Sequence, residues 1–300
     1  MSMQGKVVVV TGSNVGIGFE TAVGLAAREA TTVLACRNQA KAEAAAREVT
    51  RRTWNDDVHV VPLDLADLAS VRKAAEEVRT RWDRLDVLVN NAGGTWSSRQ
   101  ETAQGFEYTF GVNHLGPFYL TNLLLPRLRA GAPSRIINLT SVGHHAARRG
   151  MRFEDLQSEK HYEAMEAYCR SKLANVLFTR ELARRLDGDG DGDGDGDGAA
   201  VTVNAAHPGP VRSSFGMDGD LHGFMGFGIR LARPFEISPK RGAKTSLYLA
   251  TSPDVARKTG QYWVRSKPGH MSRRARDDEA ATRLWDESAR LIASVGYAIG

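Results

Sequence analysis

The sequence predicts an α/β fold: a single Rossmann-type, doubly wound parallel sheet of about seven strands, with helices on both faces. Two observations predict it. Short apolar runs alternate with helix-like segments along most of the 300 residues. The apolar runs are continuous and are not broken by a polar residue at every second position, which is typical of strands buried on both faces of a parallel sheet. We therefore expect one domain over residues 1–300.

Each element is predicted by its own pattern. Runs rich in valine, isoleucine and leucine indicate strands at residues 6–12, 31–37, 58–65, 85–93, 134–141, 201–209 and 260–264. Between them, apolar residues recur at helical spacing and indicate helices at about 17–28, 39–52, 69–82, 107–130, 160–186 and 239–251. No period of roughly 20–50 residues repeats, which excludes a solenoid.

The composition excludes several classes of protein. The net charge is +5, but the arginines are scattered and form no basic block with interleaved aromatic residues, so we expect no nucleic-acid partner. The two cysteines, Cys36 and Cys169, predict neither a disulfide scaffold nor a zinc site. No apolar run reaches about 18 residues, so no membrane span is expected. The N-terminus lacks the pattern of a signal peptide, and we expect a cytoplasmic location.

A glycine-rich turn follows the first predicted strand. The stretch TGSNVGIG places Gly12, Gly16 and Gly18 where the strand passes into a helix. Gly12 permits a tight turn, Gly16 lets the backbone approach a pyrophosphate, and Gly18 lets the helix pack against the strand. The free N–H groups and the positive dipole end of the helix favour phosphate groups at this point. The turn therefore predicts a dinucleotide site, although its spacing is T-G-x-x-x-G-x-G.

Further motifs follow in order along the chain. They are NNAG at residues 90–93, VNHLGPF with Asn113, a serine that closes the fifth strand at Ser141, YCRSK at residues 168–172 and HPG at residues 207–209. Together with the glycine turn they resemble the short-chain dehydrogenase/reductase family over about residues 5–265, and most of all its retinol-dehydrogenase-like branch. The resemblance implies a nicotinamide-dependent oxidoreductase that interconverts a ketone or aldehyde and the corresponding alcohol by hydride transfer.

The end of the second strand predicts which cofactor is used. An NAD site has an acidic residue there for the ribose 2′-hydroxyl, whereas this strand ends ACRN and presents Arg37. A guanidinium binds a 2′-phosphate through paired, charge-assisted hydrogen bonds, so we predict NADP(H), with Lys41 one helical turn on. The alternative is that Arg37 is an ordinary solvated arginine. The resemblance implies further cofactor contacts from Ser13, Asn14, Ile17, Asp64, Leu65, Asn91, Ala92, Gly93, Tyr168, Lys172, Pro208, Gly209, Val211 and Ser213.

Four residues form the expected reacting centre. Tyr168 and Lys172 are four positions apart on a helix and share a face, so the ammonium is expected to lower the pKa of the phenol and make Tyr168 a general acid and base. Ser141 would hydrogen-bond the substrate oxygen. The resemblance implies that Lys172 also holds the nicotinamide ribose and that Asn113 anchors a water. Taken alone, Ser141 could be a turn cap and Asn113 a core amide.

Three further segments carry expectations. Residues 143–167 separate Ser141 from Tyr168 and are expected to form a flap near the pocket, with His144 and His145 as polar loop residues and no metal site. Residues 213–240 are apolar and rich in glycine and methionine, which predicts a lid for a small hydrophobic carbonyl or alcohol, or else a core or subunit contact. The Asp-Gly repeat at 187–198 offers no glutamate at the twelfth position of a calcium loop, so we expect a flexible surface loop.

Two other functions remain open. A reductase of carbon–carbon double bonds, similar to protochlorophyllide reductase, would share the Tyr-x-x-x-Lys pair. A regulator that senses NADPH without chemistry would be expected to lack a member of the tetrad Asn113, Ser141, Tyr168 and Lys172, and all four are present. Family members are often homodimers or homotetramers that associate through the helices at about 107–130 and 160–186.

Overall fold

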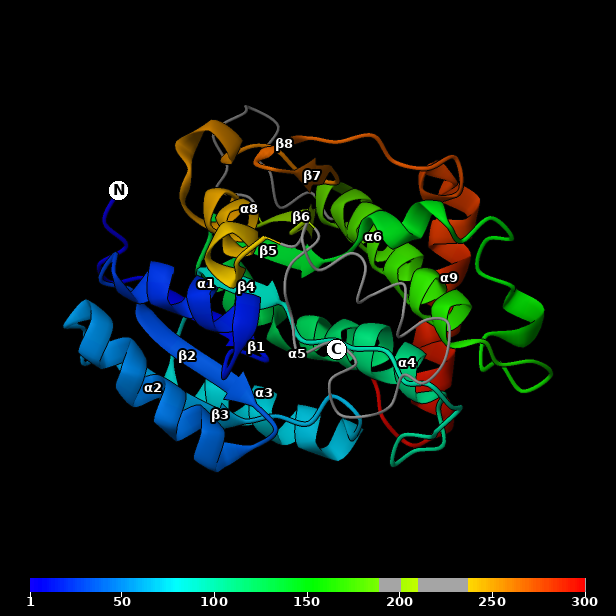
Figure 1. The fold of residues 1–300 in the computed structure, drawn as a ribbon, viewed down its shortest axis with the longest axis horizontal. Coiled ribbons are helices and arrows are strands. Elements are labelled where there is room, and N and C mark those ends of the chain that lie inside the picture. The colour runs from blue at the N-terminus through cyan, green and yellow to red at the C-terminus, as the bar shows by residue number, and fades with distance from the viewer. Residues whose placement is uncertain (189–200, 210–236, 300) are drawn as a thin grey trace.

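The computed structural model describes residues 1–188, 201–209 and 237–299. Their strands form one sheet in the order β3-β2-β1-β4-β5-β6-β7-β8 (Figure 1). The strands are β1 Val7–Thr11, β2 Thr31–Cys36, β3 Val58–Pro62, β4 Val87–Asn90, β5 Ser134–Leu139, β6 Val201–His207, β7 Tyr262–Val264 and β8 Lys267–Pro268. Neighbours from β3 to β7 are parallel and β8 is antiparallel, so the predicted fold class is confirmed and an unpredicted short edge strand is added.

Helices cover both faces of this sheet. They are α1 Gly16–Ala26, α2 Gln39–Thr53, α3 Leu68–Arg81, α4 Tyr108–Phe110, α5 Gly116–Ala130, α6 Ala164–Gly188, α8 Pro239–Thr251 and α9 Asp278–Ser294. On one face α1 contacts both α2 and α8, and on the other α3 contacts α5 and α6 contacts α9 (Figure 1). The chain order of strands reverses between β1 and β4, and in such sheets ligands bind at the carboxyl ends of the strands beside this point.

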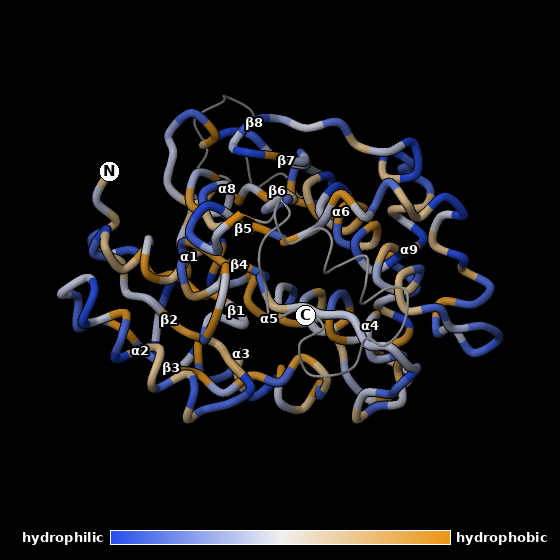
Figure 2. The backbone as a smooth tube through the Cα atoms, in the orientation of Figure 1, coloured by the Kyte–Doolittle hydropathy of each residue, from blue (hydrophilic) through white to orange (hydrophobic). Residues whose placement is uncertain are grey.

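The strands are built from apolar runs because both of their faces are buried. All five residues of β1 are buried, and so are all four of β4. The apolar colour in Figure 2 accordingly concentrates in the sheet and on the helix faces that cover it. Burial of this apolar surface is the main contribution to folding, at about 25 cal/mol per Å². The functional side chains therefore sit on a rigid frame.

The helix predicted at 107–130 differs in detail. It consists of α4, a π-helical turn η1 over Gly111–Leu115, and α5. The amide of Gly116 donates to the carbonyl of Gly111, five residues back, so the turn is wider than an α-helical one. Such π turns are rare and often occur at functional sites. This one carries Asn113.

The C-terminal helix α9 was not predicted. It is amphipathic and lies along α6, with Trp285 packed against Phe118 and Phe178 at ring-centroid distances of 4.9 and 5.9 Å. No residue of α6 from Ala164 to Ala183 is exposed, because α9 and the sheet cover it. These residues of α6 are therefore packed within the chain, and association through the helices at about 107–130 and 160–186 stays a prediction.

Two predicted segments fall largely outside the described residues. Helix α6 continues to Gly188, two residues into the expected Asp-Gly loop, and residues 189–200 are not described. The expected cofactor residues Val211 and Ser213 also lie outside the described residues, as does the expected lid up to residue 236; its last residues, from Pro239, belong to α8.

Within the described ranges, no helix has both the length and the apolarity needed to cross a bilayer.

Candidate active site

The glycine turn between β1 and α1 has backbone conformations that require glycine. Gly12 and Gly16 have φ of +62° and +65°, in the left-handed region where side chains are strained. A Cβ at Gly18 would lie 2.6 Å from the carbonyl oxygen of Gly12, so only glycine lets α1 approach the turn. The N-cap residue Val15 provides no side-chain acceptor, and the first N–H groups of α1 remain available to an anion.

Two residues predicted to contact the cofactor support the turn with their side chains. Ser13 is fully buried, and its hydroxyl donates to the carbonyl of Val10 at 2.7 Å. The Asn91 amide donates to the carbonyl of Thr11 at 2.8 Å, while the backbone N–H groups of Asn91 and Ala92 donate to the Thr11 hydroxyl at 3.0 Å. These bonds tie the end of β4 to the end of β1. The side chains of Ser13 and Asn91 therefore hold the turn in shape, and their contact with the cofactor stays a prediction.

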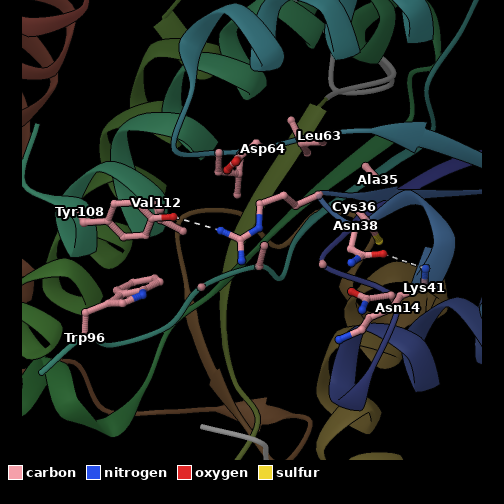
Figure 3. A pocket seen from close by; sticks show the side chains of 15 residues that line it. Asn14, Ala35, Cys36, Asn38, Lys41, Leu63, Asp64, Trp96, Tyr108 and Val112 are labelled. Carbon is pink, nitrogen blue, oxygen red and sulfur yellow. Dashed lines mark hydrogen bonds between the residues drawn. The ribbon is translucent and has the colours of Figure 1, made fainter. Parts of the chain in front are cut away.

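A cleft of about 320 Å³ opens beside the turn, at the carboxyl ends of β1 to β4 (Figure 3). It brings together many of the predicted cofactor residues, namely Gly12, Asn14, Arg37, Lys41, Asp64, Leu65, Ala92 and Gly93. Its other lining residues, which sequence reasoning missed, are Ala35, Cys36, Asn38, Leu63, Trp96, Tyr108 and Val112. The position of Tyr108 could have been foreseen. In such a fold the helices begin at the carboxyl edge of the sheet, so residues at the start of the helix predicted at 107–130 lie on the ligand side.

The end of the cleft beside β2 is cationic. Arg37 is exposed and its Nη1 donates to the hydroxyl of Tyr108 at 3.0 Å (Figure 3). Asn38 caps α2, where its side-chain oxygen accepts from the backbone N–H of Lys41 at 3.0 Å. Asp64 lines the same cleft, and its carboxylate accepts from the backbone N–H of Ala66 at 2.9 Å. In the part of the chain that the structure describes, Arg37 forms no ion pair with a carboxylate, so its charge is available to a ligand.

Asn113 and Lys172 meet at the inner end of the cleft. Asn113 is fully buried; its amide donates to the carbonyl of Gly94 at 2.8 Å and to the hydroxyl of Ser171 at 2.9 Å, and its oxygen accepts from the Gly94 N–H at 2.8 Å. A Cβ at Gly93 would lie 2.8 Å from Asn113 Oδ1 and 3.2 Å from Lys172 Nζ. Gly93 is thus the point at which the cleft reaches the predicted tetrad.

Tyr168 and Lys172 share a face of α6, as their spacing predicts, and Lys172 Nζ lies 5.5 Å from the centroid of the Tyr168 ring. The net shift of the Tyr168 pKa nevertheless runs opposite to the direction expected from Lys172 alone. Burial raises the pKa of Tyr168, and a hydrogen bond with Ser141 opposes that rise only in part. Burial also lowers the pKa of Lys172 to about 8, so the ammonium itself is destabilised by loss of hydration.

Ser141 is both a turn cap and a member of the site. It precedes the short 3-10 helix η2, Val142–His145, and its hydroxyl oxygen accepts from the Gly143 N–H at 3.1 Å. A Cβ at Gly143 would lie 3.4 Å from both Tyr168 and Cys169, so this turn packs directly on α6. The Ser141 hydroxyl is therefore held by the backbone of Gly143 while it also bonds the Tyr168 hydroxyl.

His144 is not a polar loop residue, contrary to the prediction. It is fully buried, its Nδ1 lies 2.7 Å from the carbonyl oxygen of Ser141, and its Nε2 accepts from the N–H of Ser272 at 3.3 Å. These bonds require the neutral ring with the proton on Nδ1, and burial lowers the pKa of His144 to about 4. His144 therefore links the Ser141 turn to the C-terminal segment, while His145 stays exposed.

Comparison with known proteins decides the family. A family model described as short chain dehydrogenase matches residues 6–153. Retinol dehydrogenase 13 of Homo sapiens is 45% identical over 295 residues, which cover 97% of this chain and 86% of that protein. The chain belongs to the short-chain dehydrogenase family. Within this family its relatives also confirm the predicted retinol-dehydrogenase-like branch.

Solved structures agree with this assignment to the short-chain dehydrogenases. An uncharacterized protein from Mycobacterium paratuberculosis has 35% identity and a TM-score of 0.76, over 100% of this chain and 96% of that chain. The Pseudomonas aeruginosa RhlG/NADP active-site complex has 26% identity and a TM-score of 0.64, over 87% of this chain and 94% of that chain. The family is one of oxidoreductases, which accounts for a cleft that ends at Gly93 beside the buried Lys172 and the partly buried Tyr168.

A second cavity of about 470 Å³ lies at the end of β6 in this short-chain dehydrogenase. Pro208 and Gly209 line it, as do Ile237, Thr245 and Ser266 and the cationic side chains Arg241, Lys244 and Arg265. The resemblance implies that Pro208 and Gly209, beside the end of β6, contact the cofactor.

In the described residues, no group of three or more His, Cys, Asp or Glu side chains is placed to hold a metal ion.

Proposed function

We propose that this short-chain dehydrogenase uses NADP(H) to interconvert a hydrophobic ketone or aldehyde and the corresponding alcohol. The observation that carries the proposal is the position of Lys172 Nζ, between Gly93 at the inner end of the cleft and the ring of Tyr168. The glycine turn, the uncapped first turn of α1 and the elongated cleft fit a dinucleotide. When bound, the nicotinamide supplies or accepts the hydride.

The residues of the chain would handle the proton. Tyr168 donates its hydroxyl proton to the substrate oxygen as the alcohol forms and takes it back in the reverse direction. Ser141 donates a hydrogen bond to the same oxygen, since the Gly143 N–H already fixes the position of its hydroxyl. Lys172, held close to the Tyr168 ring, favours the phenolate whenever it is protonated. Asn113 bonds both the N–H and the carbonyl of Gly94, and it thereby fixes the backbone that shapes the inner end of the cleft.

The preference for NADP(H) rests on charge. Arg37 and Lys41 stand at the end of the cleft where the adenosine ribose is expected, and Asn38 begins α2 between them. A 2′-phosphate would gain paired hydrogen bonds from the guanidinium and a favourable field from the start of the helix.

The preference for a hydrophobic substrate rests on the sequence and on relatives. Residues 213–240 are apolar. The relatives are named for retinol, which is an apolar alcohol. Together these support a substrate with little charge around the reacting carbon.

One assay tests the proposal. The purified protein is supplied with NADPH or NADH and a panel of hydrophobic ketones and aldehydes, and loss of the reduced nicotinamide is followed. We expect carbonyl reduction with NADPH and a much lower kcat/KM with NADH. Reduction only of conjugated carbon–carbon double bonds would favour the alternative resembling protochlorophyllide reductase. Tight NADPH binding without turnover of any compound would favour the regulator.

A further inference from the structure

Tyr108 lies opposite Arg37 across the cationic end of the cleft. The two residues are 71 positions apart in sequence, yet the guanidinium donates to the Tyr108 hydroxyl at 3.0 Å (Figure 3). Arg37 comes from the end of β2, and Tyr108 is the first residue of α4. Both line the cleft in which we place the adenosine half of the cofactor.

The surroundings hold the Tyr108 ring in place. The edge of Trp96 packs on it, with ring centroids 4.6 Å apart and an interplanar angle of 73°. The carbonyl of Trp96 accepts from the Tyr162 hydroxyl at 2.6 Å, which fixes the segment that bears the indole. The backbone N–H of Tyr108 donates to the carbonyl of Gln100 at 2.9 Å. The hydroxyl of Tyr108 is thus a fixed point, whereas the exposed Arg37 side chain has many rotamers of its own.

We propose that Tyr108 determines specificity for the cofactor 2′-phosphate by positioning Arg37. This inference rests on the proposed use of NADP(H) and deepens it. A guanidinium has five N–H donors, and only one is used by Tyr108, so four remain for phosphate oxygens. Because the Tyr108 oxygen accepts from Arg37, its own proton is free to donate to the same anion. Holding the guanidinium in advance reduces the entropy lost on binding.

The same bond could instead oppose cofactor binding. If Tyr108 holds Arg37 away from the phosphate, the Tyr108 hydroxyl competes with the cofactor, and removing this hydroxyl should tighten binding of the cofactor. The distinguishing quantity is the affinity for a ligand that carries the 2′-phosphate, compared with the same ligand without it.

The experiment measures binding and needs no turnover. Adenosine 2′,5′-bisphosphate and adenosine 5′-monophosphate are titrated by calorimetry into the wild type, Tyr108→Phe, Arg37→Ala and the control Tyr248→Phe. Phenylalanine keeps the ring that packs on Trp96, and Tyr248 lies on α8, where its hydroxyl is 3.5 Å from Asp254. We expect Tyr108→Phe to weaken binding of the bisphosphate by about 3- to 10-fold, the loss typical of one ordinary hydrogen bond. The monophosphate should change less than 2-fold, roughly the error of such a comparison.

Each other outcome has a defined meaning. Unchanged or tighter binding of the bisphosphate by Tyr108→Phe overturns the inference, and so does an equal loss for both nucleotides, which would indicate a purely structural role. If the wild type does not distinguish the two nucleotides, or if Arg37→Ala leaves the preference intact, the proposed use of NADP(H) itself fails. Discrimination that depends on Arg37 and not on Tyr108 leaves the proposed function standing and removes only the inference.

Discussion

The proposed reacting centre and the cationic end of the cleft, where we place the adenosine, are built in opposite ways. Asn113 and Lys172 are buried, and Asn113 makes three hydrogen bonds within the chain. Arg37, Asn38 and Lys41 are exposed; the Arg37 side chain bonds Tyr108, and the Asn38 side chain accepts from the backbone N–H of Lys41. Proton transfer needs atoms fixed to a fraction of an ångström, whereas the recognition of a phosphate adds affinity through charge-assisted hydrogen bonds from surface side chains. Substitutions at the first region should therefore abolish turnover, and those at the second should adjust affinity.

The largest effect is expected for Tyr168→Phe. Removing the hydroxyl removes the general acid and base, so kcat for carbonyl reduction should fall by about 10²- to 10⁴-fold. Because the ring remains on α6, NADPH affinity and the melting temperature should stay close to those of the wild type. Stopped-flow single turnovers would measure the chemical step directly. A variant with more than half of the wild-type rate would contradict the proposed role.

Gly93→Ala tests the point where the two regions meet. The added Cβ would lie 2.8 Å from Asn113 Oδ1 and 3.2 Å from Lys172 Nζ, so one of these groups has to move. A displacement of that kind should lower kcat/KM by about 10²-fold. Steady-state kinetics and near-ultraviolet circular dichroism would separate this local effect from unfolding. Wild-type kinetics would show that the inner cleft is less rigid than its contacts indicate.

Arg37→Ala should act on the exposed region alone. Loss of the charge-assisted bonds to a 2′-phosphate should raise the KM for NADPH by about 10- to 100-fold, with little change in KM for NADH or in kcat. Arg47→Ala, on the exposed side of α2, is the matched control for removing a cation. An equal rise for both cofactors would show that Arg37 recognises something other than the phosphate.

His144→Asn should alter the pH dependence of stability more than the rate. The pKa of His144 is about 4 in the folded chain and ordinarily 6.5, so the unfolded chain binds more protons between these values. Stability is therefore lost as pH falls from about 6.5 to 4, by at most about 1.4 kcal/mol per pH unit for this residue. Urea unfolding at several pH values should show that the free energy of unfolding falls less steeply with falling pH in His144→Asn than in the wild type. The exposed control His145→Asn should follow the wild type. Parallel curves for all three proteins would refute the assignment.

The smallest effect is expected for Lys41→Ala. The ammonium is exposed, and such cations contribute about 0–1 kcal/mol when solvated. KM for NADPH should therefore rise by less than about 5-fold. The rise should shrink as salt is added, because screening weakens an exposed charge first. A loss as large as that of Arg37→Ala would remove the distinction between the two cations.

Local patterns predicted what local forces determine. The valine run of β1 predicted a strand because burial on both faces favours apolar residues. The glycines at 12, 16 and 18 predicted the turn because a left-handed backbone or a close approach favours glycine. The role of Tyr108 depends on a contact 71 positions away, and that of His144 on Ser272, 128 positions away. Such pairings arise only in the folded chain. The raised pKa of Tyr168 was missed for the same reason. The four-residue spacing predicts the nearby ammonium of Lys172 but not the removal of the phenol from water on folding.

The π-helical turn that carries Asn113 also contacts a helix that is synthesised much later in the chain. His114, next to Asn113 in that turn, lies with its Nε2 2.9 Å from the hydroxyl of Ser288 on α9, 174 positions later. A chain emerging from the ribosome presents the glycine turn and the cleft first and this helix later. We expect stalled chains that end before α9 to lack the support of the Asn113 turn, and activity to arise only once residues beyond 288 have emerged. Translation of chains of graded length, assayed for NADPH-dependent turnover, would locate that point.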